Sequence, residues 1–168
     1  MSLLSFVKEA GEKLFGRGQA QAAMTEVKAD PSNEAKIKAA NDAAADAILD
    51  YIKTQNLSVT GLTVTFDGAT ATASVFGVAA DQATKEKAAL CAGNVAGVVA
   101  VNNMMSVDKS APEATFYTVV SGDNLSKISK AHYGDPNKYM VIFDANKPML
   151  THPDKIYPGQ VLRIPPLP

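Results

Sequence analysis

The sequence of 168 residues contains one cysteine, two histidines and no tryptophan. The single cysteine, Cys91, excludes an internal disulfide and a cluster of metal-binding thiolates. We interpret Cys91 as a small buried apolar residue, because no cationic neighbour in the sequence would activate its thiol. His132 and His152 lack a serine, cysteine or acid in the arrangement that nucleophilic catalysis requires. The sequence therefore favours a protein that is not an enzyme.

An excess of charge of one sign and a long hydrophobic run are also missing. Sixteen Lys and Arg balance seventeen Asp and Glu, leaving a formal net charge of -1, so no overall attraction to nucleic acid is expected. No segment approaches the roughly 20 apolar residues that cross a bilayer. The N-terminus has no basic region before an uninterrupted apolar run. We therefore expect a monomeric cytoplasmic protein with no export signal and no stable membrane insertion.

The chain has enough apolar residues, 46% of the total, to bury a core in each of two small domains. Residues 1–29 are expected to hold an amphipathic helix and a linker. The helix is predicted over residues 2–15, where Gly11 can end it early, by apolar residues at spacings of three and four: Leu3, Phe6, Val7, Ala10 and Leu14. The segment 16–28 is rich in Gln, Ala and Gly with little pattern, which predicts a linker or a loosely packed insertion.

Residues 30–108 have the pattern of a small α/β domain. Asp30 and Pro31 resemble an N-cap and a first helical residue, and an apolar stripe follows to about Lys53. Alternating apolar and hydroxyl residues on either side of Asp67-Gly68 predict a β-hairpin over 62–75. A second helix is predicted over 81–92 and a third strand over 98–107. The expected order is αββαβ.

This order resembles the BON domain, and so do residues Gly97-Val98-x-x-Val101-x-Asn103-x-Met105-x-Val107. The resemblance implies a small sandwich used for binding, commonly at envelopes or phospholipid surfaces, with no catalytic residues. A short polar linker over 109–115 follows it.

Residues 116–165 are predicted to fold as βααβ. The residues that carry this pattern are Tyr117-Thr-Val, Ser121-Gly-Asp-Asn-Leu125, Tyr133-Gly, Asn146 and Ile156-Tyr-Pro-Gly-Gln-Val-Leu-Arg-Ile164. Together they resemble the LysM domain, so the expected fold class is α+β with two small domains and a short N-terminal helix. The resemblance implies a shallow groove for N-acetylglucosamine polymers, lined by Ser121, Gly122, Asp123, Asn124, Leu125, Asn146, Lys147, Pro148 and Met149.

Three acids, Asp42, Asp46 and Asp50, recur every four residues on the first long helix. They could hold a divalent metal, but Lys38 precedes them at the same spacing, and a solvated polar stripe is the favoured interpretation.

The segment 91–98, Cys-Ala-Gly-Asn-Val-Ala-Gly-Val, is expected to end the second helix. A helix C-terminus leaves about four carbonyl oxygens without partners and carries roughly half a negative charge, which favours a cation. Neutral carbonyls suit a large monovalent ion such as K⁺, whereas Mg²⁺ and Ca²⁺ prefer carboxylates or retained waters. From the residues alone, an ordinary glycine cap remains the favoured interpretation.

The whole arrangement of N-terminal segment, BON part, linker and LysM part resembles small bacterial potassium-binding proteins, except over residues 17–33. This resemblance implies K⁺ binding in a sensor or buffer whose domains dock on the ion. The carbonyl argument assigns the contacts to the main-chain oxygens of Val7, Ala10, Gly93, Val95 and Val98. The alternatives are an envelope protein that binds peptidoglycan through its LysM part and a BON part that binds a lipid surface.

Overall fold

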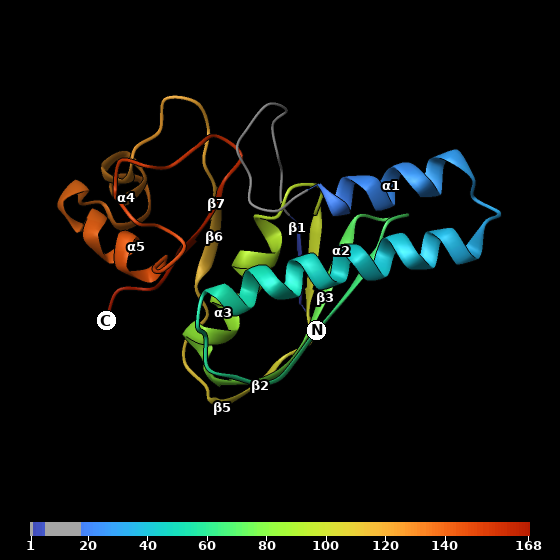
Figure 1. The fold of residues 1–168 in the computed structure, drawn as a ribbon. Helices are drawn as coiled ribbons and strands as arrows, with labels where there is room; N and C mark the ends of the chain where they lie inside the picture. Colours follow the sequence, from blue (N-terminus) through green and yellow to red (C-terminus); the bar gives the residue numbers. More distant parts are fainter. Residues whose placement is uncertain (1, 6–17) are drawn as a thin grey trace.

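The computed structural model describes residues 2–5 and 18–168. Its helices and strands form two parts joined by residues 110–114 (Figure 1). In chain order these elements are β1 (Ser2–Ser5), α1 (Gln19–Ala29), α2 (Glu34–Thr54), β2 (Val59–Asp67), β3 (Thr72–Asp81), α3 (Gln82–Gly93), β4 (Ala100–Asn103), β5 (Ser106–Lys109), β6 (Thr115–Thr118), α4 (Leu125–Tyr133), the 3-10 turn η1 (Pro136–Lys138), α5 (Tyr139–Ala145) and β7 (Val161–Ile164).

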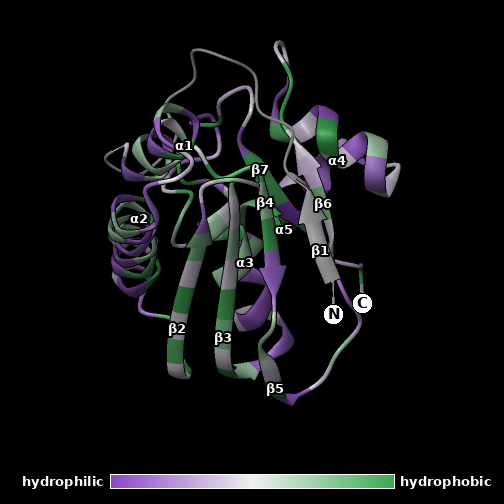
Figure 2. Cartoon of the chain, turned by 90° about the vertical axis from the view of Figure 1, so that its right-hand side faces the viewer, coloured by the Kyte–Doolittle hydropathy of each residue, from purple (hydrophilic) through white to green (hydrophobic). Residues whose placement is uncertain are grey.

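The first part is a mixed sheet covered by helices. The order of strands across the sheet is β1-β4-β3-β2 (Figure 2). Strands β2 and β3 form the expected antiparallel hairpin, and α3 carries the chain from β3 to the parallel strand β4. The core includes residues from α2, β3 and α3, among them Ile48, Ile52, Val75 and Leu90, each at most 1% exposed. The predicted order αββαβ is present in this part, as α2, β2, β3, α3 and β4.

The strand predicted over 98–107 is divided in two. Strand β4 pairs with the first half of β3, and β5 pairs with the second half, both in parallel. Between them, the side chain of Asn103 accepts a hydrogen bond from the backbone N–H of Met105. A backbone N–H that bonds to a side chain is not available to the ladder, so the pairing is interrupted there.

The N-terminal region differs from the prediction in two places. Residues Ser2–Ser5 form β1, antiparallel to β4, so the helix predicted over 2–15 is wrong at its start. The backbone edge of β4 outweighs a helical pattern that Gly11 already weakens. The remainder of that predicted helix lies outside the described residues. The helix of this region is α1, which occupies most of the segment predicted as a linker.

Helix α1 packs alongside α2 as an antiparallel hairpin (Figure 1). Ala20 and Ala23 are its buried residues, and their small side chains allow close approach. A Cβ on Gly68, in the β2–β3 turn, would lie 2.8 Å from the carbonyl oxygen of Ala23. Alanine contributes little to a hydrophobic pattern, so this contact could not be predicted from periodicity. Asp30 ends α1, and Asn33 is the N-cap of α2, contrary to the prediction for Asp30.

The second part has the predicted order βααβ. Asn124 caps α4 through the N–H of Lys127, and Gly134 ends that helix with a left-handed backbone. The two strands, β6 and β7, pair antiparallel from Thr115–Ile164 to Thr118–Val161. Within the part of the chain that the structure describes, no helix is long and apolar enough to cross a membrane.

Candidate functional site

The turn after α3 is a helix C-terminus, as the sequence predicts. The backbone N–H of Asn94 donates to the carbonyls of Leu90 at 3.1 Å and Cys91 at 3.2 Å. Val95 N–H donates to Ala92 O at 3.3 Å, and Val98 N–H donates to Val95 O at 3.1 Å. Residues 90–95 and Val98 are buried. The negative end of the α3 dipole therefore lies in an environment of low polarity.

Three of the five predicted carbonyl donors, Gly93, Val95 and Val98, lie on this one turn. The carbonyl of Val95 accepts a hydrogen bond from Val98 N–H. The other two predicted donors, Val7 and Ala10, lie outside the described residues. Their contribution to a site stays a prediction.

Helix α1 contacts this turn at Gly97. The φ angle of Gly97 is +91°, and a Cβ there would lie 2.7 Å from Gln21 N and 3.0 Å from the carbonyl carbon of Ala20. Only glycine allows the turn after α3 to approach the N-terminal end of α1 this closely. This contact could not be predicted from the sequence, because residues 16–28 lack apolar periodicity.

The titratable groups of α3 nearest the turn do not favour a thiolate or carboxylate metal site. Cys91 is 2% exposed, and burial raises the pKa of its thiol to about 12. Burial also lowers the pKa of Lys87, with a further contribution from Arg163. Among residues 2–5 and 18–168, no group of three or more His, Cys, Asp or Glu could hold a metal ion.

The acidic stripe on α2 is a solvated face. Asp42, Asp46 and Asp50 are all exposed, and the ammonium group of Lys38 lies 2.5 Å from a carboxylate oxygen of Asp42. This arrangement agrees with the favoured interpretation of the stripe.

The side chain of Asn94 crosses from the first part to the second. Its Nδ2 donates to Leu90 O and to Val161 O, both at 3.0 Å. Its Oδ1 accepts from Val161 N–H at 2.8 Å. Asn94 is fully buried, so these bonds form away from water. Losing one of them would leave a buried polar group without a partner, which costs free energy.

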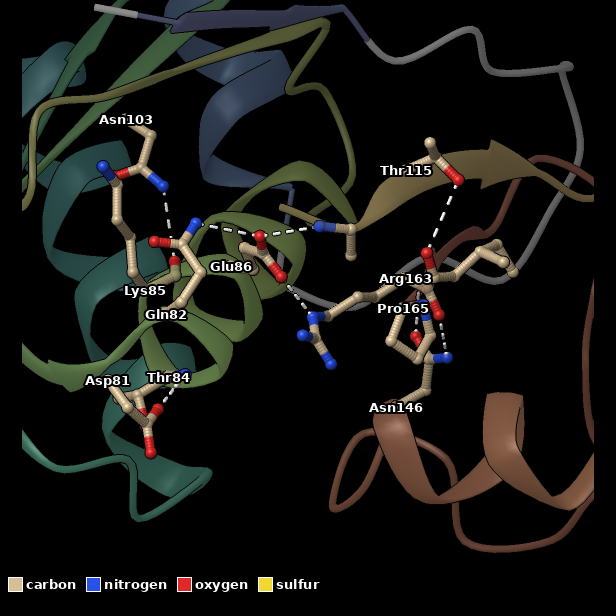
Figure 3. A network of polar contacts seen from close by, with 12 residues as sticks. Asp81, Gln82, Thr84, Lys85, Glu86, Asn103, Thr115, Asn146, Arg163 and Pro165 are labelled. Carbon is tan, nitrogen blue, oxygen red and sulfur yellow. Dashed lines mark hydrogen bonds and ion pairs between the residues drawn. The ribbon is translucent and has the colours of Figure 1, made fainter. Parts of the chain in front are cut away.

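An ion pair joins the same two elements further along α3. Arg163 Nε lies 2.5 Å from Glu86 Oε2, with both side chains less than 10% exposed. The other oxygen, Oε1, accepts from Gln82 Nε2 and from the backbone N–H of Ala114, each at 2.9 Å (Figure 3). The carboxylate is thus satisfied on both oxygens, as a buried charge requires.

One face of α3 therefore belongs to the interface between the two parts. Its members recur every four residues and are all buried: Gln82, Glu86, Leu90 and Asn94. This face of α3 was not predicted from the sequence. The available signal was a row of polar residues at helical spacing within an alanine-rich helix, which indicates polar groups held inside the protein.

The predicted glycan groove is only partly accessible. Its exposed members are Ser121, Gly122, Asn124, Lys147 and Pro148, whereas Leu125, Asn146 and Met149 are buried. The carboxylate of Asp123 accepts hydrogen bonds from Tyr117 Oη at 2.8 Å and Val120 N–H at 3.0 Å. This bond to Asp123 is the main reason that the pKa of Tyr117 is raised. Asp123 therefore holds the loop after β6 against Tyr117 of that strand.

An open cavity of about 380 Å³ lies beside these loops. It is lined by Asn124, Leu125, Ser126, Tyr139, Pro153 and Asp154. Of the nine residues predicted for the groove, two line this cavity.

Comparison with known proteins agrees with both domain resemblances. The BON domain model matches residues 40–109, and the LysM domain model matches residues 117–165. The chain is 42% identical to the potassium binding protein Kbp of Escherichia coli O6:H1, over 98% of this chain and 99% of that protein. It is also 51% identical to an uncharacterized protein of Deinococcus radiodurans over 51 residues, which span 30% of this chain and 19% of that one.

The fold and the matched regions define a two-domain BON–LysM protein, built from two non-catalytic binding modules. The similarity to Kbp extends over nearly the whole chain, including the N-terminal region before the BON match. The chain belongs to the Kbp family.

Proposed function

We propose that this protein binds K⁺ through main-chain carbonyl oxygens at the turn after α3. The observation that carries the proposal is the 42% identity, over 98% of the chain, to a protein named for potassium binding. The predicted donors on the described part of the chain are Gly93, Val95 and Val98. Val7 and Ala10 would complete the set from the N-terminal segment.

The chemistry of the turn fits an alkali ion. The turn offers neutral oxygens at the negative end of a buried helix, which favours a cation without binding a divalent one strongly. One buried side-chain oxygen at the start of α1 also lacks a hydrogen-bond partner among the described residues. Gln19 Oε1 is buried and accepts no hydrogen bond in the described structure, and Gln19 directly precedes the two residues of α1 that contact Gly97. Such an oxygen is costly to bury unless a proton donor or a cation satisfies it.

We further propose that K⁺ binding favours the docked arrangement of the two domains, and that the protein acts as a cytoplasmic sensor or buffer of the ion. The contacts between α3 and β7 support this proposal, since they begin within the turn itself, at Asn94. An ion that binds the docked state more tightly shifts the population toward it by its difference in affinity.

Calorimetric titration of the full chain with KCl and with NaCl, at constant ionic strength, tests the proposal. We expect saturable heat with KCl and much weaker binding with NaCl. The radius of gyration from small-angle scattering should fall in KCl and not in NaCl or choline chloride. Equal heats for the two salts would contradict a selective K⁺ site, and cell fractionation would test the cytoplasmic location.

Peptidoglycan binding through the LysM domain is the second candidate. The match over residues 117–165 and the cavity beside Asn124 and Leu125 favour it. The expected result for this candidate is retention on purified cell wall, which soluble N-acetylglucosamine oligomers would release. Failure of the full chain to sediment with cell wall would exclude it.

A further inference from the structure

The outer edge of β7 is completed by two asparagine side chains. Strand β6 pairs with one edge of β7, which leaves the N–H and C=O groups of Val161 and Arg163 on the other edge. Asn146 serves Arg163, because its Oδ1 accepts from Arg163 N–H at 2.7 Å and its Nδ2 donates to Arg163 O at 2.8 Å. Asn94 serves Val161 in the same way. A side-chain amide here replaces a neighbouring strand.

The two asparagines differ in where they come from. Asn146 belongs to the LysM domain and also donates to Ile142 O at 2.7 Å. Asn94 belongs to the BON domain and also donates to Leu90 O at 3.0 Å, at the end of α3. The first amide therefore holds the LysM domain to itself, and the second holds the turn after α3 to the LysM domain.

Asn94 also lies within the turn that carries the predicted carbonyl donors. The main chain of Asn94 lies between Gly93 and Val95, two of the three predicted donors on the turn. Its side chain is fully buried, and both its Nδ2 and its Oδ1 form hydrogen bonds. The bonds to Val161 of β7 therefore fix the orientation of this side chain. The Gly93 carbonyl and the Asn94 N–H belong to one planar peptide group, and that N–H donates to Leu90 O and Cys91 O, so the Gly93 carbonyl is held in place together with Asn94.

We propose that Asn94 is a positioning residue for the ion site, which makes K⁺ affinity depend on the LysM domain. This inference rests on the proposed function. Asn94 itself contributes no ligand through its side chain. It holds the turn in the orientation that presents the carbonyls, and the LysM strand holds Asn94. The two events, ion binding and docking, are then coupled reciprocally, as linked equilibria must be.

The test compares Asn94→Ala with Asn146→Ala in the full chain. Both variants remove a buried amide that bonds to the N–H and C=O of one β7 residue and to one helix carbonyl, so both should lower the thermal midpoint; the Asn94 amide also donates to Met149 Sδ at 3.4 Å. Only Asn94→Ala should weaken K⁺ binding, by about tenfold, which is within the usual range of coupling between sites. Asn146→Ala should stay within about twofold of the wild type. Calorimetry with KCl and NaCl measures both affinities.

The ratio of K⁺ to Na⁺ affinity separates positioning from a general loss of stability. Misplaced carbonyls should lower this ratio in Asn94→Ala, whereas a smaller folded fraction lowers both affinities equally. Asn94→Leu retains most of the side-chain volume without the hydrogen bonds, and replaces the alanine variant if circular dichroism shows that the latter is unfolded. It should give the same weakening.

Two results would overturn the inference. One is an affinity in the Asn94 variants equal to that of the wild type, and the other is an equal loss of affinity in Asn146→Ala. Both leave the proposed function intact, because the wild type binds K⁺ in either case. Absence of K⁺ binding in the wild type would instead overturn the proposed function and this inference with it.

Discussion

At the scale of the residue, Gly97 is the position where the turn after α3 packs against the start of α1. Its positive φ and the short distances to Gln21 N and the Ala20 carbonyl both require glycine. A side chain at this position would push α1 away from the turn that follows α3. The packing of α1 therefore sets the shape of this turn from one side, and Asn94 sets it from the other.

Gly97→Ala should lower the free energy of unfolding by about 3 kcal/mol, since left-handed backbone strain adds to a clash with backbone atoms. Gly122→Ala is the matched control. Gly122 has a similar φ of +86°, but no described atom lies within 4 Å of a Cβ placed there. Gly122→Ala should lower the free energy of unfolding by the backbone strain alone, about 1 kcal/mol. Urea denaturation measures both, and equal losses would show that the contact with α1 is unimportant.

At the scale of the element, α3 connects the BON sheet, the turn and the LysM domain. Its N-cap is Asp81, whose carboxylate accepts from Thr84 N–H at 2.7 Å. This backbone hydrogen bond is the main reason that the pKa of Asp81 lies below its ordinary value. A depressed pKa means that the carboxylate stabilises the fold above the unfolded pKa, and that this contribution is lost as the pH falls through the folded pKa.

Asp81→Ala should therefore lower the free energy of unfolding by about 1 kcal/mol at neutral pH, which is the usual effect of removing an N-cap. The difference from the wild type should shrink as the pH falls below the ordinary pKa of aspartate. Asp81→Asn is the control, because its amide oxygen caps the helix without titrating. Urea denaturation across this pH range measures the three chains. A difference that does not change with pH would contradict the role of the carboxylate.

Most elements could be predicted from local patterns in the sequence. The hairpin followed from alternation around Asp67-Gly68, and α4 followed from Asn124 and Gly134, because these signals act within a few residues. Two elements could not be predicted. Helix α1 is stabilised by contacts of alanines with α2 and with glycines distant in sequence, and β1 is stabilised by the edge of β4. Such contacts depend on the tertiary fold, which overrides weak local preference.

The candidate site was predictable to a similar extent. The turn after α3 could be identified because a helix followed by Gly-rich residues exposes carbonyls. The role of Asn94 could not, since its partner Val161 is 67 residues away in sequence. The buried pair of Glu86 and Arg163 was missed for the same reason.

At the scale of the whole molecule, the two domains are joined by polar groups that are buried and paired. Asn94 with Val161 and Glu86 with Arg163 both connect α3 to β7. Removing one partner of a buried ion pair typically costs about 3–5 kcal/mol, because the other charge loses its compensation. This kind of interface defines one docked orientation, since each polar group has to meet its partner.

We propose that the turn after α3 binds an alkali ion with its main-chain oxygens. Rubidium replaces potassium in such a site and scatters anomalously, so a crystal of the full chain soaked in RbCl shows where the ion binds. We expect one strong anomalous peak within coordination distance of the carbonyl oxygens of Gly93, Val95 and Val98. A strong peak elsewhere, with these oxygens bonded only to protein or water, would contradict the account.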